Sequence, residues 1–257
     1  MVLSIDQLMS WFSGVFWLFL RVGGFFMVVP VIGSQLIPAR IRIVLAFMVA
    51  VSIAPLLPPM PMITQLDVGL FLNVFVQLLS GIGLGFATVI FFQVFIITGQ
   101  FIAMQMGLGF ASMVDPTNGI SVTILSQFFL LLVSLSFLAN SGHLLMLEVL
   151  VQGFQLSAFG VTGGIEEMTW QLVLLGQWMF SGALMIAFPA VVSLLIVNLS
   201  FGVMTRAAPQ LNIFSLGFPF SLVFGLLVIW FLIQGWSAQF QLVFSDFLLW
   251  AQHWSGL

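Results

Sequence analysis

The stretch VGLFLNVFVQLLSGIGLGFATVIFFQVFIITGQFIAMQ, residues 68–105, decides the fold class of this chain of 257 residues. It lies inside a longer run without ionisable side chains, between Asp67 and Asp115. Its apolar residues are continuous and do not alternate with polar ones, which favours a helix over a strand of a membrane barrel. Such a helix would be about 57 Å long, although about 20 residues suffice to cross a bilayer. The excess must project beyond the bilayer, fold back, or be buried in other protein.

The composition of the whole chain indicates an integral membrane protein. It is 62% hydrophobic and 4% charged, whereas a soluble domain carries about 25% charged residues because its surface faces water. We therefore expect an all-α, polytopic membrane protein. The net charge of -3 gives no reason to expect a nucleic-acid partner. The lack of cysteine excludes disulfides, thiolate metal ligands and a cysteine nucleophile.

Turn and charge signals divide the sequence into six apolar segments, each expected to be helical. The segments are Trp11–Val31, Ile41–Leu57, Val68–Gln105, Ile120–Val151, Met168–Met204 and Phe214–Trp236. The first segment has no basic start and no small-residue cleavage site, so we expect a retained span instead of a secretory signal. The proline-rich stretch APLLPPMPM after the second segment predicts an extended connector.

The few charged residues outside the segments predict the orientation. Arg40 and Arg42 lie in the first connector, and Arg206 lies in the fifth, so an all-spanning chain places them on one side. The positive-inside rule makes that side cytoplasmic. The acidic connectors, with Asp67 and with Glu166–Glu167, then face the other side.

One charge lies inside a predicted span. Arg21 is in the middle of the first segment, where a lone arginine costs about 2.5–3.5 kcal/mol on insertion scales. It needs a partner, and the candidates are Glu148 and Asp115. The pair either fixes the helix register or lies on an ion path; we favour the first and predict that Arg21 and Glu148 form a buried register-fixing pair.

The remaining polar and glycine residues within spans have structural explanations. His143 and Glu148 are five residues apart, which is a poor spacing for a metal site, so we expect His143 to make an interhelical hydrogen bond. The cluster Gly81, Gly83 and Gly85 predicts either a close-packing helix face or a functional kink.

Motifs for catalysis are missing from the sequence. There is no HExxH helix, no GxSxG elbow and no lysine that could complete a phosphate-binding loop. We expect no enzymatic activity, no metal and no cofactor.

The stretch QMGLGFASMVDPTNG, residues 105–119, interrupts the apolar run. Gly107 and Gly109 loosen the helix, and Asp115-Pro116 and Asn118-Gly119 favour turns. The loop is too apolar for water, and irregular backbone does not face lipid, so it lies in protein or across a lumen. It is either a tucked connector or a plug that closes a pore by excluding water. The predicted plug residues are Met106, Gly107, Leu108, Gly109, Phe110, Ala111, Met113, Val114, Asp115 and Pro116.

Three stretches resemble the FliR family, the R subunit of the flagellar type III export gate, which is related to a subunit of virulence injectisomes. They are GQFIAMQMGLGFASMVDP at 99–116, TRAAPQLNIFSLGFP at 205–219 and RVGGFFMVVPVIGSQLIPARIRI at 21–43. They occur in the family's order and cover the chain from the first segment to the last.

The resemblance implies more than the composition does. In the family, one R subunit assembles with several FliP and FliQ copies into a closed helical cone that exports unfolded flagellar proteins, with FlhB and FlhA as further partners. The location implied is the bacterial inner membrane, in the flagellar basal body. Residues 1–160 would be a FliP-like part and residues 165–257 a FliQ-like hairpin. The resemblance also favours the plug over the connector.

The turn of that hairpin would face the cytoplasmic entrance and contact other subunits. The residues implied are Arg206, Pro209, Gln210, Asn212, Phe214, Gly217 and Pro219. Without the resemblance, Arg206 would be a membrane-surface anchor and Pro209 a helix breaker.

Two other functions fit parts of the sequence. A stand-alone secondary transporter or small-solute channel is compatible with broken helices and charges in spans. The halves show no obvious inverted repeat, however, and polar residues are too few for a solute site. A purely structural assembly factor is the second alternative. It differs from the export-gate subunit only in that its loop does not line the lumen.

Overall fold

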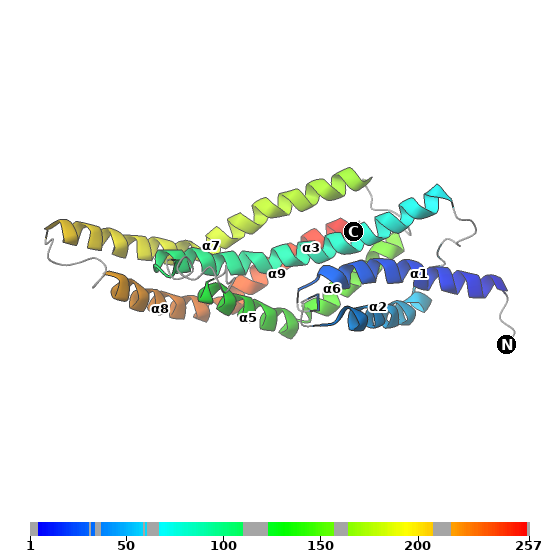
Figure 1. Cartoon of the computed structure of the whole chain (residues 1–257), viewed down its shortest axis with the longest axis horizontal. Helices are drawn as coiled ribbons and strands as arrows, with labels where there is room; N and C mark the ends of the chain where they lie inside the picture. Colours follow the sequence, from blue (N-terminus) through cyan, green and yellow to red (C-terminus); the bar gives the residue numbers. More distant parts are fainter. Residues whose placement is uncertain are drawn as a thin grey trace. The chain divides into compact units, whose positions relative to one another are not determined.

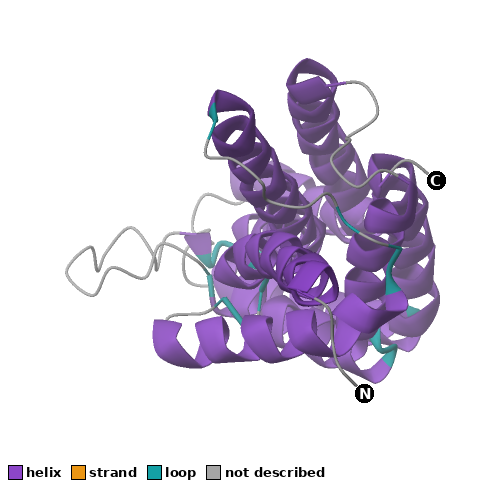
Figure 2. Cartoon of the chain, turned by 90° about the vertical axis from the view of Figure 1, so that its right-hand side faces the viewer, coloured by secondary structure: helices purple, strands orange, loops and turns teal. Residues whose placement is uncertain are grey.

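The computed structural model describes residues 5–30, 32–33, 37–58, 60, 67–109, 123–156, 164–207 and 217–255. The regular elements in these ranges are all helices (Figures 1 and 2). They are α1 (Ile5–Val28), α2 (Ala39–Ile53), the short 3-10 helix η1 (Ala54–Leu56), α3 (Val68–Gln105), α5 (Ile124–Ala139), α6 (Gly142–Leu156), α7 (Gly164–Ala207), α8 (Phe218–Gln234) and α9 (Trp236–Ser255). The predicted all-α class is confirmed.

The helices in the described ranges have the length and composition of membrane spans. Four of them qualify alone: α1, α2 continued by η1, α3 and α7. The pairs α5–α6 and α8–α9 each qualify together and are bent by 63°, which brings the number of candidate spans to as many as six. The prediction of a polytopic membrane protein is confirmed.

Two predicted segment boundaries are wrong. The segment Ile120–Val151 holds two helices, because the chain turns at Ser141, whose φ is 55°. The sequence after Trp236 is helical as far as Ser255, although the last segment was expected to end at Trp236. The glutamine, aspartate and histidine residues after Trp236 make that stretch less apolar than the six predicted segments. Its buried residues recur at helical spacing, a signal that could have revealed α9. These residues are Phe240, Phe244, Phe247, Ala251 and Trp254.

The chain forms two compact units. One consists of Met1–Ile90, Phe137–Gly176 and Asp246–Leu257, and the other of Phe91–Ser136 and Gln177–Ser245. Each unit draws on both sides of the predicted division at residues 160–165, so the division into FliP-like and FliQ-like parts stays a prediction.

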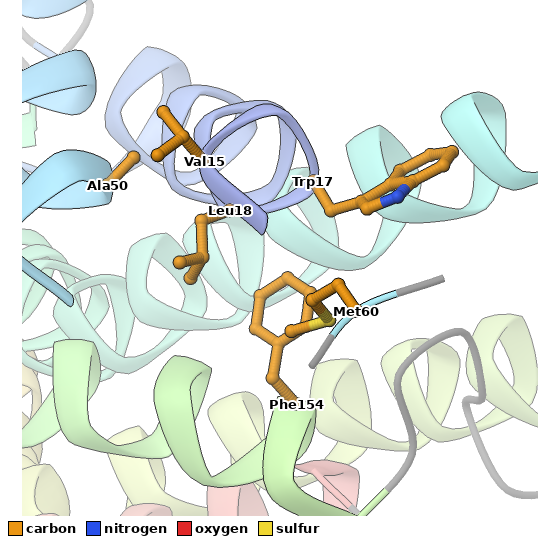
Figure 3. Packing of buried hydrophobic residues seen from close by; sticks show 6 residues of the cluster. All are labelled: Val15, Trp17, Leu18, Ala50, Met60 and Phe154. Atoms are coloured by element: carbon orange, nitrogen blue, oxygen red, sulfur yellow. The ribbon is translucent and has the colours of Figure 1, made fainter. Parts of the chain in front are cut away.

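In the first unit, α1 and α2 form an antiparallel hairpin (Figure 1). A core cluster joins them to α6, with Leu18 of α1, Met60 and Phe154 of α6 close together (Figure 3). Helix α3 meets α1 backbone to backbone at glycines. A Cβ on Gly81 would collide with the Arg21 carbonyl, and one on Gly85 would lie 3.0 Å from the Phe25 carbonyl. Because α3 is unbroken there, the glycine cluster acts as a close-packing face.

In the second unit, aromatic rings join α3, α5 and α9. Trp236 lies 5.1 Å from Phe95 and 5.8 Å from Phe129, measured between ring centroids. Its indole N–H donates to the Ser136 hydroxyl over 2.8 Å, so the tryptophan both packs and satisfies its polar atom.

Candidate functional site: the anchored ends of the apolar loop

The C-terminal end of α3 leads into the predicted plug and has a defined helix-ending motif. The Leu108 N–H donates to the Ala103 carbonyl over 3.0 Å, and the Gly107 N–H to the Met104 carbonyl over 3.1 Å. This pair of bonds is a Schellman motif, which requires a left-handed residue after the helix. Gly107 provides it with a φ of +80°, a conformation that is unfavourable for residues with a Cβ.

A side chain from α7 caps the same helix end. The Asn198 amide donates to the Gln105 carbonyl over 3.1 Å, satisfying a carbonyl that has no partner within the helix. The Asn198 oxygen lies 3.3 Å from the Ser221 hydroxyl of α8, which also lies 2.6 Å from the Gly217 carbonyl. This polar node holds α3, α7 and α8 together where the loop begins.

The first loop residues pack against α8. Met106 is 2% exposed. A Cβ on Gly225 would come within 2.5–2.6 Å of the Met106 Cγ, Cε and Sδ atoms, so the methionine fills the space that the glycine leaves. A Cβ on Gly107 would lie 3.0 Å from the ring of Phe218. Met106 is therefore packed between α3 and α8 at the start of the loop, and its predicted place in the plug stays a prediction.

The other end of the loop, at the start of α5, is also held on α3. The Thr123 hydroxyl accepts from the Ser126 N–H over 3.3 Å, which caps α5. The Ser126 hydroxyl lies 3.1 Å from the Gln100 side-chain oxygen and 3.0 Å from the Ile96 carbonyl. Gly99 allows this approach, because a Cβ there would lie 2.8 Å from the Ser126 Cα.

The two anchors lie near each other. Gln100 and Gln105 are separated by about 7.5 Å along α3, at 1.5 Å per residue. The described residues on the two sides of 110–122 are therefore both held by the last turns of α3.

The predicted plug and turn residues are described only in part. Met106, Gly107 and Leu108 belong to the helix-ending motif described above, and Gly109 is the last described residue before the loop. Phe110, Ala111, Met113, Val114, Asp115 and Pro116 lie outside the described residues, as do Pro209, Gln210, Asn212 and Phe214. Of the remaining turn residues, Arg206 is exposed in the last turn of α7, Gly217 is the buried N-cap of α8, and Pro219 is exposed in its first turn.

The predicted pair of Arg21 and Glu148 takes a different form. Arg21 is buried at 3% exposure, and its Nε–H donates to the Gln77 side-chain oxygen over 2.8 Å. Its guanidinium also lies 3.8 Å from the ring centre of Phe154. Glu148 is exposed and accepts from Gln152 over 3.1 Å. The expectation that Glu148 is buried with Arg21 is therefore wrong in the described structure. The Gln77 side-chain oxygen and the Phe154 ring contact the guanidinium instead.

The other titratable candidate is His143, which is half-buried near the start of α6. Within the described ranges its Nδ1 has no hydrogen-bond partner, so the expected interhelical bond is not seen there at that atom. Among the same residues no group of three histidine, aspartate or glutamate side chains could hold a metal ion.

Sequence reasoning missed the uncharged polar residues that build these sites. They are Gln77, Gln100, Thr123, Ser126, Asn198 and Ser221. Their signal was present, since each is a hydrogen-bonding side chain within or beside an apolar segment, where every polar group needs a partner.

The fold and the anchored loop define a class: a polytopic helical membrane protein with an apolar segment tied to the end of one helix. A family model described as "Bacterial export proteins, family 1" matches residues 12–247. The chain belongs to the FliR family of these export proteins.

The relatives match over most of their length. Flagellar biosynthetic protein FliR of Escherichia coli (strain K12) is 35% identical over 221 residues, which cover 86% of this chain and 84% of the relative. FliR of Pectobacterium carotovorum is 32% identical over 87% of this chain and 85% of the relative. FliR of Bacillus subtilis (strain 168) is 30% identical, covering 84% of each.

Proposed function

We propose that this chain is a non-enzymatic subunit of the flagellar protein export gate, in which its apolar loop closes a helical channel for unfolded flagellar proteins. The family assignment supports a role in flagellar biosynthesis and export. The observation that carries the plug is the anchoring of both loop ends on the last turns of α3. Fixed ends allow a central segment to be displaced by a substrate while the helices stay in place.

The proposal includes partners. FliP and FliQ would surround the chain, with FlhB and FlhA at the cytoplasmic side, in the inner membrane and the flagellar basal body. The length of α7 supports this, because its 44 residues would extend about 66 Å, roughly twice the hydrocarbon core of a bilayer. Large apolar side chains along it are exposed, so protein must cover what lipid does not reach. They include Phe180, Met185, Phe188, Ile196, Leu199 and Val203.

The plug is tested by measuring ion leak through the assembled gate. The double variant Phe110→Ala, Met113→Ala removes two bulky loop side chains and leaves the packed Met106 side chain intact. We expect leak to rise, because a hydrophobic constriction excludes ions only while it stays narrow and dry. Met104→Ala is the matched control, since Met104 is an exposed methionine in the last turn of α3.

The outcomes of this test are distinct. Raised leak in the double variant alone supports the plug. Unchanged leak in a fully assembled complex contradicts it and leaves the loop as a connector. The subunit role is tested separately by the native mass of the detergent-extracted chain. One copy in a large assembly with FliP- and FliQ-type subunits supports that role, whereas a stable monomer in their presence would favour a stand-alone transporter.

A further inference from the structure

An apolar cleft opens among α1, α2 and the first part of α3, all within the first compact unit. Its volume is about 220 Å³. It is lined by Phe19, Leu20, Gly23, Met27, Ala39, Arg42, Ile43 and Leu78. For comparison, an apolar cavity of about 150 Å³ is large enough to hold benzene, so the cleft has room for hydrocarbon.

Gly23 creates much of this room. A Cβ built on Gly23 meets nothing within 4 Å. Its neighbour Gly24 differs, because a Cβ there would lie 2.8 Å from the Leu78 carbonyl of α3. Gly24 is therefore required for helix packing, whereas Gly23 leaves an open place on the face of α1 that carries Phe19 and Met27 at intervals of four residues.

One arginine lines the cleft, and a second lies two residues before it in the same helix turn. The first is Arg42, and the second is Arg40, which is exposed in the first turn of α2. Together they are two of the four basic residues of the chain. Arg42 donates to the Ile37 carbonyl from Nε and Nη2, over 3.2 and 3.0 Å, and to the Gly33 carbonyl from Nη1 over 3.4 Å. These bonds use three of its five N–H groups, which leaves donors available for an acceptor such as a phosphate oxygen.

Like a phospholipid, the cleft has one charged end and one apolar end. Met27 and Arg42 lie at the end where α2 begins, and Phe19 lies about 12 Å further along α1, in contact with Phe47 of α2 at 6.1 Å between ring centroids. With η1, α2 forms a span of 18 residues, close to bilayer thickness. Its first turn therefore lies at a membrane surface, and the cleft runs from the arginines toward the membrane interior.

We propose that this cleft binds an anionic phospholipid, with its phosphate at Arg42 and part of an acyl chain over Gly23, and that Arg40 in the same turn adds to the attraction of the headgroup. The charge of the cleft favours an anionic lipid. Among the described residues that line it, the only charged group is the cation of Arg42, and a second cation, Arg40, lies in the same turn. Basic residues at a membrane surface attract anionic lipids. The site is separate from the loop anchors and does not depend on the proposed plug.

Native mass spectrometry of the full-length chain, extracted with its bound subunits, tests the proposal. Phosphatidylglycerol and phosphatidylcholine with the same acyl chains are added in turn. We expect the wild-type chain to retain phosphatidylglycerol more strongly. Arg40→Gln should weaken that retention about fivefold with little effect on phosphatidylcholine, since one basic residue near the surface contributes about this factor. Arg40 is the better choice for substitution because Arg42 also holds the connector.

Two glycine substitutions locate the acyl chain. Gly23→Leu fills the cleft and should lower retention of both lipids. Gly202→Leu is the control, because a Cβ on Gly202 of α7 also meets nothing within 4 Å. In complexes that contain the same subunits as the wild type, it should bind lipid like the wild type. If Gly23→Leu and Gly202→Leu retain the same amount of lipid, the cleft is not the binding site. Equal retention of the two lipids by the wild type overturns the phosphate contact. No retained lipid at all overturns the whole proposal in favour of a protein partner over the cleft.

Discussion

At the residue scale, neutral polar side chains bind the buried groups for which the sequence predicts charged partners. Glu148 and Asp115 are the partners that the sequence predicts for Arg21, because carboxylates are the groups of opposite charge. The structure uses the Gln77 oxygen and the Phe154 ring. Arginine only donates hydrogen bonds, so the Gln77 oxygen must face it and the amide nitrogen faces away. That nitrogen is buried without a partner among the described residues.

The contact between Arg21 and Gln77 predicts an asymmetry between single substitutions. Gln77→Leu leaves the Arg21 cation buried with only an aromatic neighbour and should lower stability by about 1.5–3 kcal/mol, the range for hydrogen bonds to charged groups. The double variant Arg21→Met, Gln77→Leu should recover part of this loss, because apolar residues of similar size can replace a buried polar pair. Thermal unfolding of the chain in detergent measures both.

The control for this prediction is Glu148→Gln. Glu148 is exposed and bonded to Gln152, so its substitution should change little. If Glu148→Gln lowered stability as much as Gln77→Leu, the result would support the register-fixing pair of Arg21 and Glu148 expected from the sequence.

At the element scale, apolar length and continuity predict the helices well, but they do not locate the corners. The segment 68–105 is one helix with the bounds expected from the sequence. The corner between α5 and α6 falls at Asn140-Ser141-Gly142, where a Cβ on Gly142 would collide with the Phe137 ring. The Asn-Ser-Gly run is a turn signal that the hydrophobicity on both sides concealed. The buried stripe of α9 was concealed by the polar residues between its members.

The end of α3 gives a prediction in which two similar substitutions have opposite effects. Gly107→Ala should destabilise the chain by about 1–2 kcal/mol, the cost of a left-handed conformation for a residue with a Cβ. Its methyl group would also press on Phe218. Gly202→Ala, within α7 and in open surroundings, should stabilise it by about 1 kcal/mol through helix propensity.

Unfolding temperatures of the two variants, measured in the same detergent, test this prediction. Shifts in opposite directions agree with the Schellman motif at Gly107. A Gly107→Ala variant as stable as the wild type would mean that the loop does not begin at a left-handed residue.

At the scale of the whole molecule, the sequence predicts that the chain lies in a membrane, but it does not distinguish surfaces that face lipid from surfaces that face protein. Both are apolar, and hydrocarbon tails are as apolar as leucine, so composition alone cannot separate them. Helix length provides a criterion. With η1, α2 has 18 residues and fits a bilayer, whereas α7 has 44 and does not.

This criterion predicts different responses to the same substitution on the two helices. Met185 of α7 is 78% exposed and Met48 of α2 is 62% exposed. A tryptophan at either position stays apolar, so both variants should insert into the membrane. Fluid lipid adapts to the larger ring, but a packed protein surface does not, because overpacking costs about 1–3 kcal/mol. We therefore expect Met185→Trp to reduce the amount of chain recovered in the large native assembly and Met48→Trp to leave it unchanged. Equal recovery of the two variants, at equal membrane levels, would mean that the exposed face of α7 at Met185 lies in lipid, and the excess length of the helix would then need another explanation.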